Sequence, residues 1–431
     1  MLTNTTRCVF VPAALLKDAG RAAAVGGSCC PQARRRFGVS RCHFIKPPPR
    51  PKPRETVDIP DLETITYGER MHHVPGLAKP VFPHWEPDHK NPRFYKAPPA
   101  QQMPLFKDTP CFMFNQRTNV LEGVRQAAWL TKTKVMPSFP SQLLSRTENL
   151  EEQIPDVDER VQNAIKHARF WDTTENRPKK EKYCNTLLLN LLHLCGMLQP
   201  SHSAIGRRMF TEDYSLAVTW KRGEDLFQVR GRNGLLHSSM DPLPAVCGKD
   251  EVSDTADHTL ETFYPISPTI DLQKANVYKE NLNCTGFRGN SPYPHAHTLY
   301  FLESADVNCK LRPEQFRAKM AMFTFGNALS RAYQLYGTEP QQLLERPVTV
   351  QAVGTNGRIF QFLVFQLNTT DLTGDDGVKN QMWLDEDVEL YDFAKVRPLI
   401  KKKEVRVPAG LSGYKPEVFR KFLALYLHGA E

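Results

Sequence analysis

The sequence lacks the motifs by which most enzyme families are recognised. It contains no G-x-S-x-G nucleophile elbow, no H-E-x-x-H metal pair and no G-x-x-x-x-G-K-[ST] phosphate loop. Its ten cysteines include no C-x-x-C pair, so the spacing typical of structural zinc sites is also missing. We therefore expect no catalytic residues, no metal and no cofactor, and we predict that the protein is not an enzyme.

Acidic residues are almost absent from the N-terminus. Residues 1–54 carry eleven Lys or Arg and one acid, a net charge of +10, whereas the remaining chain carries 45 bases and 46 acids, a net charge of −1. This region has no apolar run of signal-peptide or membrane length, and residues 12–25 show an amphipathic helical pattern. These properties are typical of a mitochondrial transit peptide. We predict a leader at residues 1–37 and a matrix location; the alternative is a basic tail that stays in the cytosol or nucleus.

The segment after the leader is rich in proline. Residues 43–110 hold fifteen of the 34 prolines, together with several aromatic residues. Proline excludes helices and central strands, and the aromatic content argues against a solvated linker. We predict an extended strap at residues 38–110 that buries side chains on its own body or on a partner. A ligand for Src-homology or WW domains has a similar composition, but the matrix would lack those partners.

The remaining residues, 111–431, alternate between helical and strand patterns. Helices are predicted near residues 118–134, 157–171, 185–198, 311–337 and 415–429, the first beginning at Thr118 and the third apolar nearly all round. Hairpins are predicted around Gly223 and around Asn356-Gly357, a pair that favours a tight turn. Because no regular βαβ alternation appears, we predict an α+β fold of mixed helices and antiparallel hairpins, with the proline-rich segment as an extended N-terminal arm.

Two groups of histidines are candidates for metal sites. His193, Cys195 and His202 fall in and after an apolar helix, where core packing is far more frequent than zinc binding. His295 and His297 would share one face of a strand, but no third ligand has a recognisable spacing. Structural roles are therefore favoured for both groups.

Residues 371–377, DLTGDDG, resemble the first half of a calcium-binding loop. The twelfth position of such a loop is a bidentate glutamate, and here it is Met382. We therefore interpret this segment as an acidic surface turn.

Basic residues outside the leader gather in two places. Neither place carries an RRM, KH or C₂H₂ signature, so both are candidates for contacts with phosphates and not with bases. A solvated charged surface is the alternative. The candidate RNA-binding residues are Lys46, Arg50, Lys52 and Arg54 in the proline-rich arm and Arg397, Lys401, Lys402, Lys403 and Arg406 near the C-terminus.

Several long strings resemble one protein family. They are PRFYKAPP, EGVRQAAWLTKTK, LETFYPISPTIDL, EQFRAKMAMFTFGNAL, VQAVGTNGRIFQFLVFQLNTTDL and KPEVFRKFLALYLHGA. On these residues the chain resembles the animal mitochondrial large-ribosomal-subunit protein thirty-seven family.

The resemblance implies a non-enzymatic structural component of the mitochondrial large ribosomal subunit that supports translation. Its partners would be ribosomal RNA and neighbouring ribosomal proteins, including one of related fold, and no membrane span is implied. The near-neutral charge of residues 55–431 further indicates that much of the area by which the protein contacts its partners faces protein and not RNA. A matrix enzyme with an unrecognised site and a matrix RNA-processing factor remain the alternatives.

Overall fold

The computed structural model describes residues 99, 102, 110–147, 154–170, 179–276, 283–285, 291–303, 311–401 and 404–430. All of them belong to one compact unit of the chain, Asp88–Glu431. The predicted leader lies outside the described residues, and so does the predicted strap apart from Pro99, Gln102 and Pro110. These two predictions therefore stay predictions.

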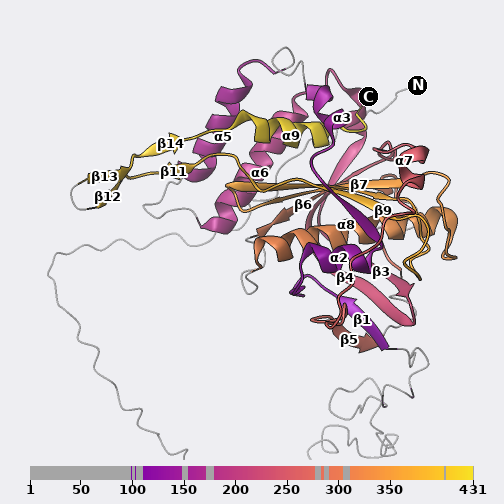
Figure 1. Ribbon diagram of the computed structural model, residues 1–431. Helices are drawn as coiled ribbons and strands as arrows, with labels where there is room; N and C mark the ends of the chain where they lie inside the picture. Colours follow the sequence, from indigo (N-terminus) through magenta and orange to yellow (C-terminus); the bar gives the residue numbers. More distant parts are fainter. Residues whose placement is uncertain are drawn as a thin grey trace, which may run out of the picture. The chain divides into compact units, whose positions relative to one another are not determined.

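Ten strands of the described residues form one mixed sheet (Figure 1). Along the sheet the order is β2 (Thr133–Pro137), β9 (Asn380–Leu384), β8 (Ile359–Leu367), β7 (Val348–Thr355), β6 (His295–Leu302), β4 (Asp225–Ser239), β1 (Pro110–Phe114) and β5 (Gln273–Asn276). Two further strands pair off this path, β10 (Val388–Glu389) with β8 and β3 (Arg208–Arg222) with β4. The predicted α+β class is confirmed. The sheet is mixed, however: the pairs β1–β4, β2–β9 and β6–β7 are parallel, whereas only antiparallel hairpins were predicted.

Helices cover both faces of this sheet (Figure 1). One face packs against α2 (Val124–Leu130) and α8 (Pro313–Tyr336); the other packs against α3 (Ser141–Leu144), α5 (Val157–Phe170), α6 (Lys180–Gly196) and α9 (Pro416–Leu427). Short elements connect them: α7 (Lys249–Ser253) and two 3₁₀ turns, Ser145–Thr147 and Ser203–Arg207. Because side chains alternate along a strand, β8 feeds both cores, with Phe362 in one and Phe365 in the other.

The helix α8 is the most deeply buried helix of the described residues. It begins after Arg312, whose backbone N–H donates to Gln315 Oε1 at 3.0 Å, and it ends at Gly337, with φ 86°. The sequence predicted these bounds and an apolar stripe along one side. The structure buries every residue from Ala318 to Ser330, because α2 and β3 pack on the helix as well as the sheet.

Both predicted hairpins are confirmed. β7 and β8 pair from Val348↔Leu367 to Thr355↔Phe360 around the Asn356-Gly357 turn. β3 and β4 pair over 15 residues each, which is longer than the predicted runs.

The predicted start of the first helix at Thr118 is wrong. α2 begins at Val124, and the Thr118 hydroxyl accepts a hydrogen bond from the backbone N–H of Asn115 at 2.9 Å instead. Gly123 has a φ of 57°, which interrupts helical geometry. A Cβ at this glycine would lie 3.0 Å from the Cβ of Glu314, so the close approach of the α8 N-terminus explains the break.

The turn at Gly357 provides a test of the hairpin geometry. Gly357 has a φ of 85°, and an added Cβ would lie 2.6 Å from the ring of Tyr183 and 2.7 Å from Cys184 Sγ. We expect Gly357→Ala to lower the free energy of unfolding in urea by about 2–4 kcal/mol, since backbone strain and steric overlap add. Gly377→Ala, with a φ of 75° and open space, is the matched control and should cost about 1 kcal/mol. Equal losses in the two variants would contradict the contact with α6.

Candidate nucleic-acid interface

The C-terminal group of candidate RNA-binding residues lies on a two-stranded ribbon. Two short antiparallel sheets follow one another along it: β11 (Phe393–Lys395) with β14 (Gly410–Ser412), and β12 (Leu399–Lys401) with β13 (Glu404–Val407) (Figure 1). We call residues 393–412 the ribbon. The register shifts between Leu399 and Ile400, which pair with Val407 and Val405, so Arg406 is the extra residue of a β-bulge.

The ribbon combines positive charge with exposed apolar side chains. The sequence of residues 393–412 contains six Lys or Arg, of which Lys402 and Lys403 lie outside the described residues, and one acid, Glu404, which gives a net charge of +5. Arg397 and Arg406 are exposed and form no ion pair with any described residue. The exposed large apolar side chains are Val396 (56%), Leu399 (49%), Ile400 (59%) and Val405 (59%). A two-stranded ribbon with such a surface is marginal by itself in water, so we expect a partner to cover it.

The base of the ribbon is fixed to the core. Tyr391 is 1% exposed and its hydroxyl donates to the Gly357 carbonyl at 2.8 Å. Ala394 in β11 is buried, and its carbonyl accepts from Arg169 Nη2 of α5 at 3.2 Å. Arg169 also lies over the ring of Tyr183, with its Cζ 4.2 Å from the ring centroid. The direction in which the ribbon leaves the body is therefore set by packed residues.

The structure brings only part of the candidate set together. Arg397, Lys401 and Arg406 lie on the ribbon, where Lys401 pairs in register with Glu404. The remaining candidates, Lys402, Lys403, Lys46, Arg50, Lys52 and Arg54, lie outside the described residues. The positive charges were predictable from the sequence but the ribbon was not predicted; the signal for it was the β-branched and leucine residues that flank the basic residues.

The two histidine groups that were candidates for metal sites are not arranged as metal ligands in the described residues. His193 is exposed on α6 whereas Cys195 is fully buried, so the two point away from each other. His297 is 1% exposed, and its Nε2 lies 2.7 Å from the Asp241 carbonyl oxygen. Burial and the nearby Arg208 lower the pKa of His297 to about 3. Within the described residues no three His, Cys, Asp or Glu side chains gather as a metal would require.

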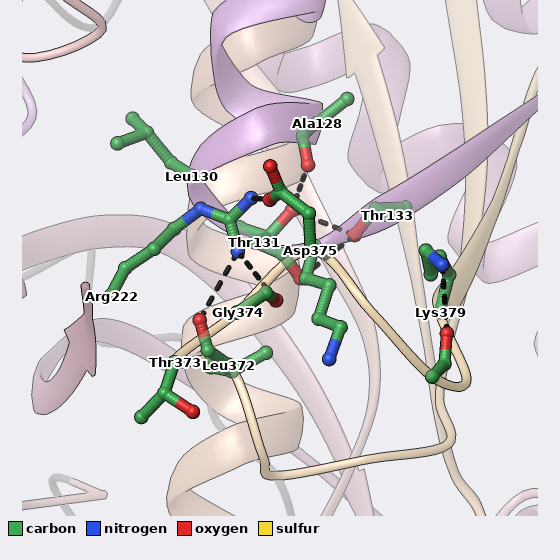
Figure 2. Close-up of polar contacts among 12 residues, drawn as sticks. Ala128, Leu130, Thr131, Thr133, Arg222, Leu372, Thr373, Gly374, Asp375 and Lys379 are labelled. Atoms are coloured by element: carbon green, nitrogen blue, oxygen red, sulfur yellow. Dashed lines mark hydrogen bonds and ion pairs between the residues drawn. The ribbon is translucent and has the colours of Figure 1, made fainter. Parts of the chain in front are cut away.

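The segment 371–377 is held by cations of the protein itself (Figure 2). Arg222 is 3% exposed and donates to the carbonyls of Leu372, at 3.1 Å, and Gly374, at 3.4 Å, and pairs with the Asp375 carboxylate. The Arg222 Cζ also lies 4.1 Å from the centroid of the Trp129 ring. The Asp375 carboxylate, which stands at the fifth, ligand position of such a loop, is thus paired with a cation of the protein, in agreement with the interpretation as a surface turn.

Two buried lysines complete this cluster. Lys132 Nζ donates to the Asp371 carbonyl at 3.0 Å, and Lys379 Nζ donates to the carbonyls of Ala256, at 2.9 Å, and Gly377, at 2.8 Å. Burial lowers the pKa of Lys132, Arg222 and Lys379. Lys132 and Arg222, which are distant in the sequence, and Lys379, which lies just after the loop, therefore hold it together. This arrangement was not predictable from the sequence, because no local pattern links Lys132 and Arg222 to the loop.

None of the helices in the described part of the chain combines the length and apolar character needed to cross a bilayer.

Comparison with known proteins gives two kinds of match. A family model described as "Mitochondrial 28S ribosomal protein S30 (PDCD9)" matches residues 313–428. The chain is 53% identical over 370 residues to the Gallus gallus protein named "Large ribosomal subunit protein mL37", a match that covers 86% of each chain. It is 50% identical over 395 residues to the Bos taurus protein of the same name, covering 91% of this chain and 92% of the relative. The two descriptions name different ribosomal components, and the relatives, which match most of the chain, decide between them.

The buried guanidinium of Arg222 provides a test of the cation cluster. We expect Arg222→Met to lower the free energy of unfolding by about 3–5 kcal/mol, because it leaves two carbonyls without a donor and the Asp375 carboxylate without its partner. Lys180→Met is the control: its pair with Glu303 is 45% and 34% exposed, and we expect a loss below about 1 kcal/mol. Similar losses of unfolding free energy in the two variants, measured in urea, would show that the buried cluster stabilises the fold no more than an exposed ion pair does.

The buried His297 predicts a loss of stability in mild acid. Its pKa is about 3 in the folded protein and ordinarily 6.5, so between these values the unfolded chain binds more protons. Stability from this residue is present above pH 6.5 and is lost as the pH falls toward 3. We expect about 1 kcal/mol to be lost between pH 7 and 5.5. His297→Gln should flatten this part of the profile, whereas His193→Gln, at an exposed position, should leave it unchanged; identical slopes in all three proteins would contradict the assignment.

Proposed function

The chain belongs to the mL37 family of large ribosomal subunit proteins, and on that premise we propose that it is a structural component of the mitochondrial large ribosomal subunit. One observation carries this proposal: half of the residues are identical to mL37 over 91% of this chain and 92% of the relative. A match over nearly the whole length of both chains argues for the same role and not for one shared domain.

We further propose a matrix location and a non-enzymatic role. The leader predicted at residues 1–37 would direct import, and its acid-poor, amphipathic composition supports this. The buried titratable groups of the described residues support a structural role, since Arg222, Lys379 and His297 each hold backbone carbonyls or lie beside them. No observation among the described residues favours either alternative, a matrix enzyme or a matrix RNA-processing factor.

We also propose that the ribbon is the ribosomal RNA contact of the folded body. Its net charge of +5, within a chain whose residues 55–431 sum to −1, concentrates phosphate-binding capacity in one element. The arm residues Lys46, Arg50, Lys52 and Arg54 form the second proposed contact. The apolar side chains of the ribbon support additional contact with protein neighbours, of which the fold-related ribosomal protein expected from the family is one.

The ribosomal role is tested first by sedimentation. At physiological salt, the tagged full-length chain expressed in animal cells should co-sediment with the mitochondrial large subunit. Recovery only in light fractions free of ribosomes would contradict the proposed role.

Ultraviolet crosslinking of the same large-subunit fractions tests the ribbon. A variant with Arg397, Lys401, Lys402, Lys403 and Arg406 replaced by Glu should lose RNA crosslinks from ribbon peptides by about tenfold or more, because each replacement removes a phosphate contact. Charge reversal at Lys221 and Arg230, which are exposed on the β3–β4 hairpin, is the control and should leave ribbon crosslinks unchanged. Equal crosslinking in the ribbon variant and in the wild type would reject the ribbon as an RNA contact.

A further inference from the structure

A groove of about 670 Å³ lies at the C-terminal end of α8. We call it the α8 groove. Its walls come from residues 242–245, from the start of β6, from the last turns of α8 and from residues 345–350, which lead into β7. Most of the lining is apolar, including Pro242, Pro244, Leu335, Pro347 and Val348, and Leu335 remains 47% exposed. The groove lies apart from the ribbon in the sequence and shares no residue with it.

Arg331 of α8 lines this groove without a carboxylate partner among the described residues. Its Nη1 donates to Gln334 Oε1 at 3.0 Å and its Nη2 to His295 Nε2 at 3.1 Å, whereas its buried Nε has no hydrogen-bond acceptor in the described part of the chain. Burial and the adjacent Arg331 lower the pKa of His295 to about 4, so this histidine is neutral and contributes no charge. The guanidinium is therefore a partly buried cation with no carboxylate within ion-pair distance among the described residues.

Two neighbours of Arg331 in the lining are also hydrogen-bond donors. Thr349 is 3% exposed, and its hydroxyl has no partner in the described part of the chain. Arg346 is exposed at the rim and forms no ion pair there; the acid next to it, Glu345, is exposed as well. The carboxylate of Asp241, near His295, is held by Arg207 at 3.1 Å. Buried polar groups normally have partners, and the two arginines carry positive charge, so an acidic ligand would complement this part of the lining.

The apolar walls of the groove indicate which class of ligand it can bind. A nucleic-acid backbone is held by solvated Lys and Arg side chains on open surfaces, whereas the α8 groove is lined mainly by apolar side chains. Strand addition is excluded as a mode of binding, because β7 is already paired on both edges, with β6 and with β8. A ligand must therefore enter by its side chains, with apolar groups for the walls and a carboxylate for the arginines.

We propose that the α8 groove binds a segment of a neighbouring protein, with its apolar side chains in the groove and a carboxylate on Arg331 and Arg346. This inference rests on the proposed function, because the neighbour is a component of the same particle. A carboxylate at the Arg331 guanidinium would supply the counter-charge that this cation lacks among the described residues. The site is distinct from the ribbon, which we assign to RNA.

The experiment places a photocrosslinker in the groove of the full-length chain. Leu335 is replaced by p-benzoylphenylalanine, and in a control chain Leu189, which is 44% exposed on α6, is replaced instead. Large-subunit fractions are isolated by sedimentation, irradiated and analysed by mass spectrometry. We expect position 335 to crosslink to one protein peptide that carries apolar residues with an Asp or Glu close by, and position 189 not to reach that peptide.

Two arginine variants make the result specific. In the crosslinker chain, Arg346→Glu and Arg331→Gln should each lower the yield of this peptide by about tenfold, when normalised to the chain present in the fraction, because each removes a charged hydrogen-bond donor. Arg346 is exposed, so its replacement tests the site without endangering the fold. Lys221→Glu, at an exposed position on β3, is the matched charge-reversal control and should leave the yield unchanged.

Four outcomes would overturn the inference. They are crosslinks to RNA alone, crosslinks to this chain alone, a yield at position 335 no higher than at position 189, and a yield that neither arginine variant lowers. A chain that is absent from the large-subunit fractions would instead contradict the proposed function, and this inference with it. Sedimentation and crosslinking are measured on the same samples, so the two failures are distinguishable.

Discussion

The rest of this structure depends on the burial of α8 against one sheet. Thirteen consecutive residues, Ala318–Ser330, are buried, and Gly326 lets β3 approach so closely that an added Cβ would lie 2.8 Å from Leu216 Cδ2. A helix surrounded in this way needs covering elements on every side, which α2, β3 and the central strands supply. The break at Gly123 follows from this packing, because the N-terminus of α8 lies against that glycine.

Covering both faces of the sheet leaves little of it available for partners. The central strands β6, β7 and β8 have their side chains in two cores, so contacts with other molecules fall on elements outside the layers. The ribbon extends from the layer of α5 and α9, and the α8 groove lies where α8 ends beside β7. Both surfaces combine apolar side chains with arginine, a composition common where proteins meet other macromolecules.

Elements with strong local patterns were predictable from the sequence. The bounds of α8 follow from Pro313 and Gly337, and the β7–β8 turn follows from Asn356-Gly357. The parallel pairs were not predictable, because β2 and β9 meet through tertiary packing across more than half of the described sequence. For the candidate interface, the charges were visible but the ribbon was not, and the unpartnered Arg331 could be recognised only once its neighbours were known.

The pairing of β2 with β9 also constrains the order in which the chain can fold. Thr131 and Asn380, which share a hydrogen bond at this pairing, are 249 residues apart, and Lys132 and Asp371 are 239 apart. A chain that emerges N-terminus first therefore presents Thr133–Pro137 long before its partner strand exists. Contacts between residues so far apart in the sequence form late and slowly, and until then the unpaired edge of β2 can pair with strands other than β9. The nascent body consequently has a long interval in which molecular chaperones are most useful to it.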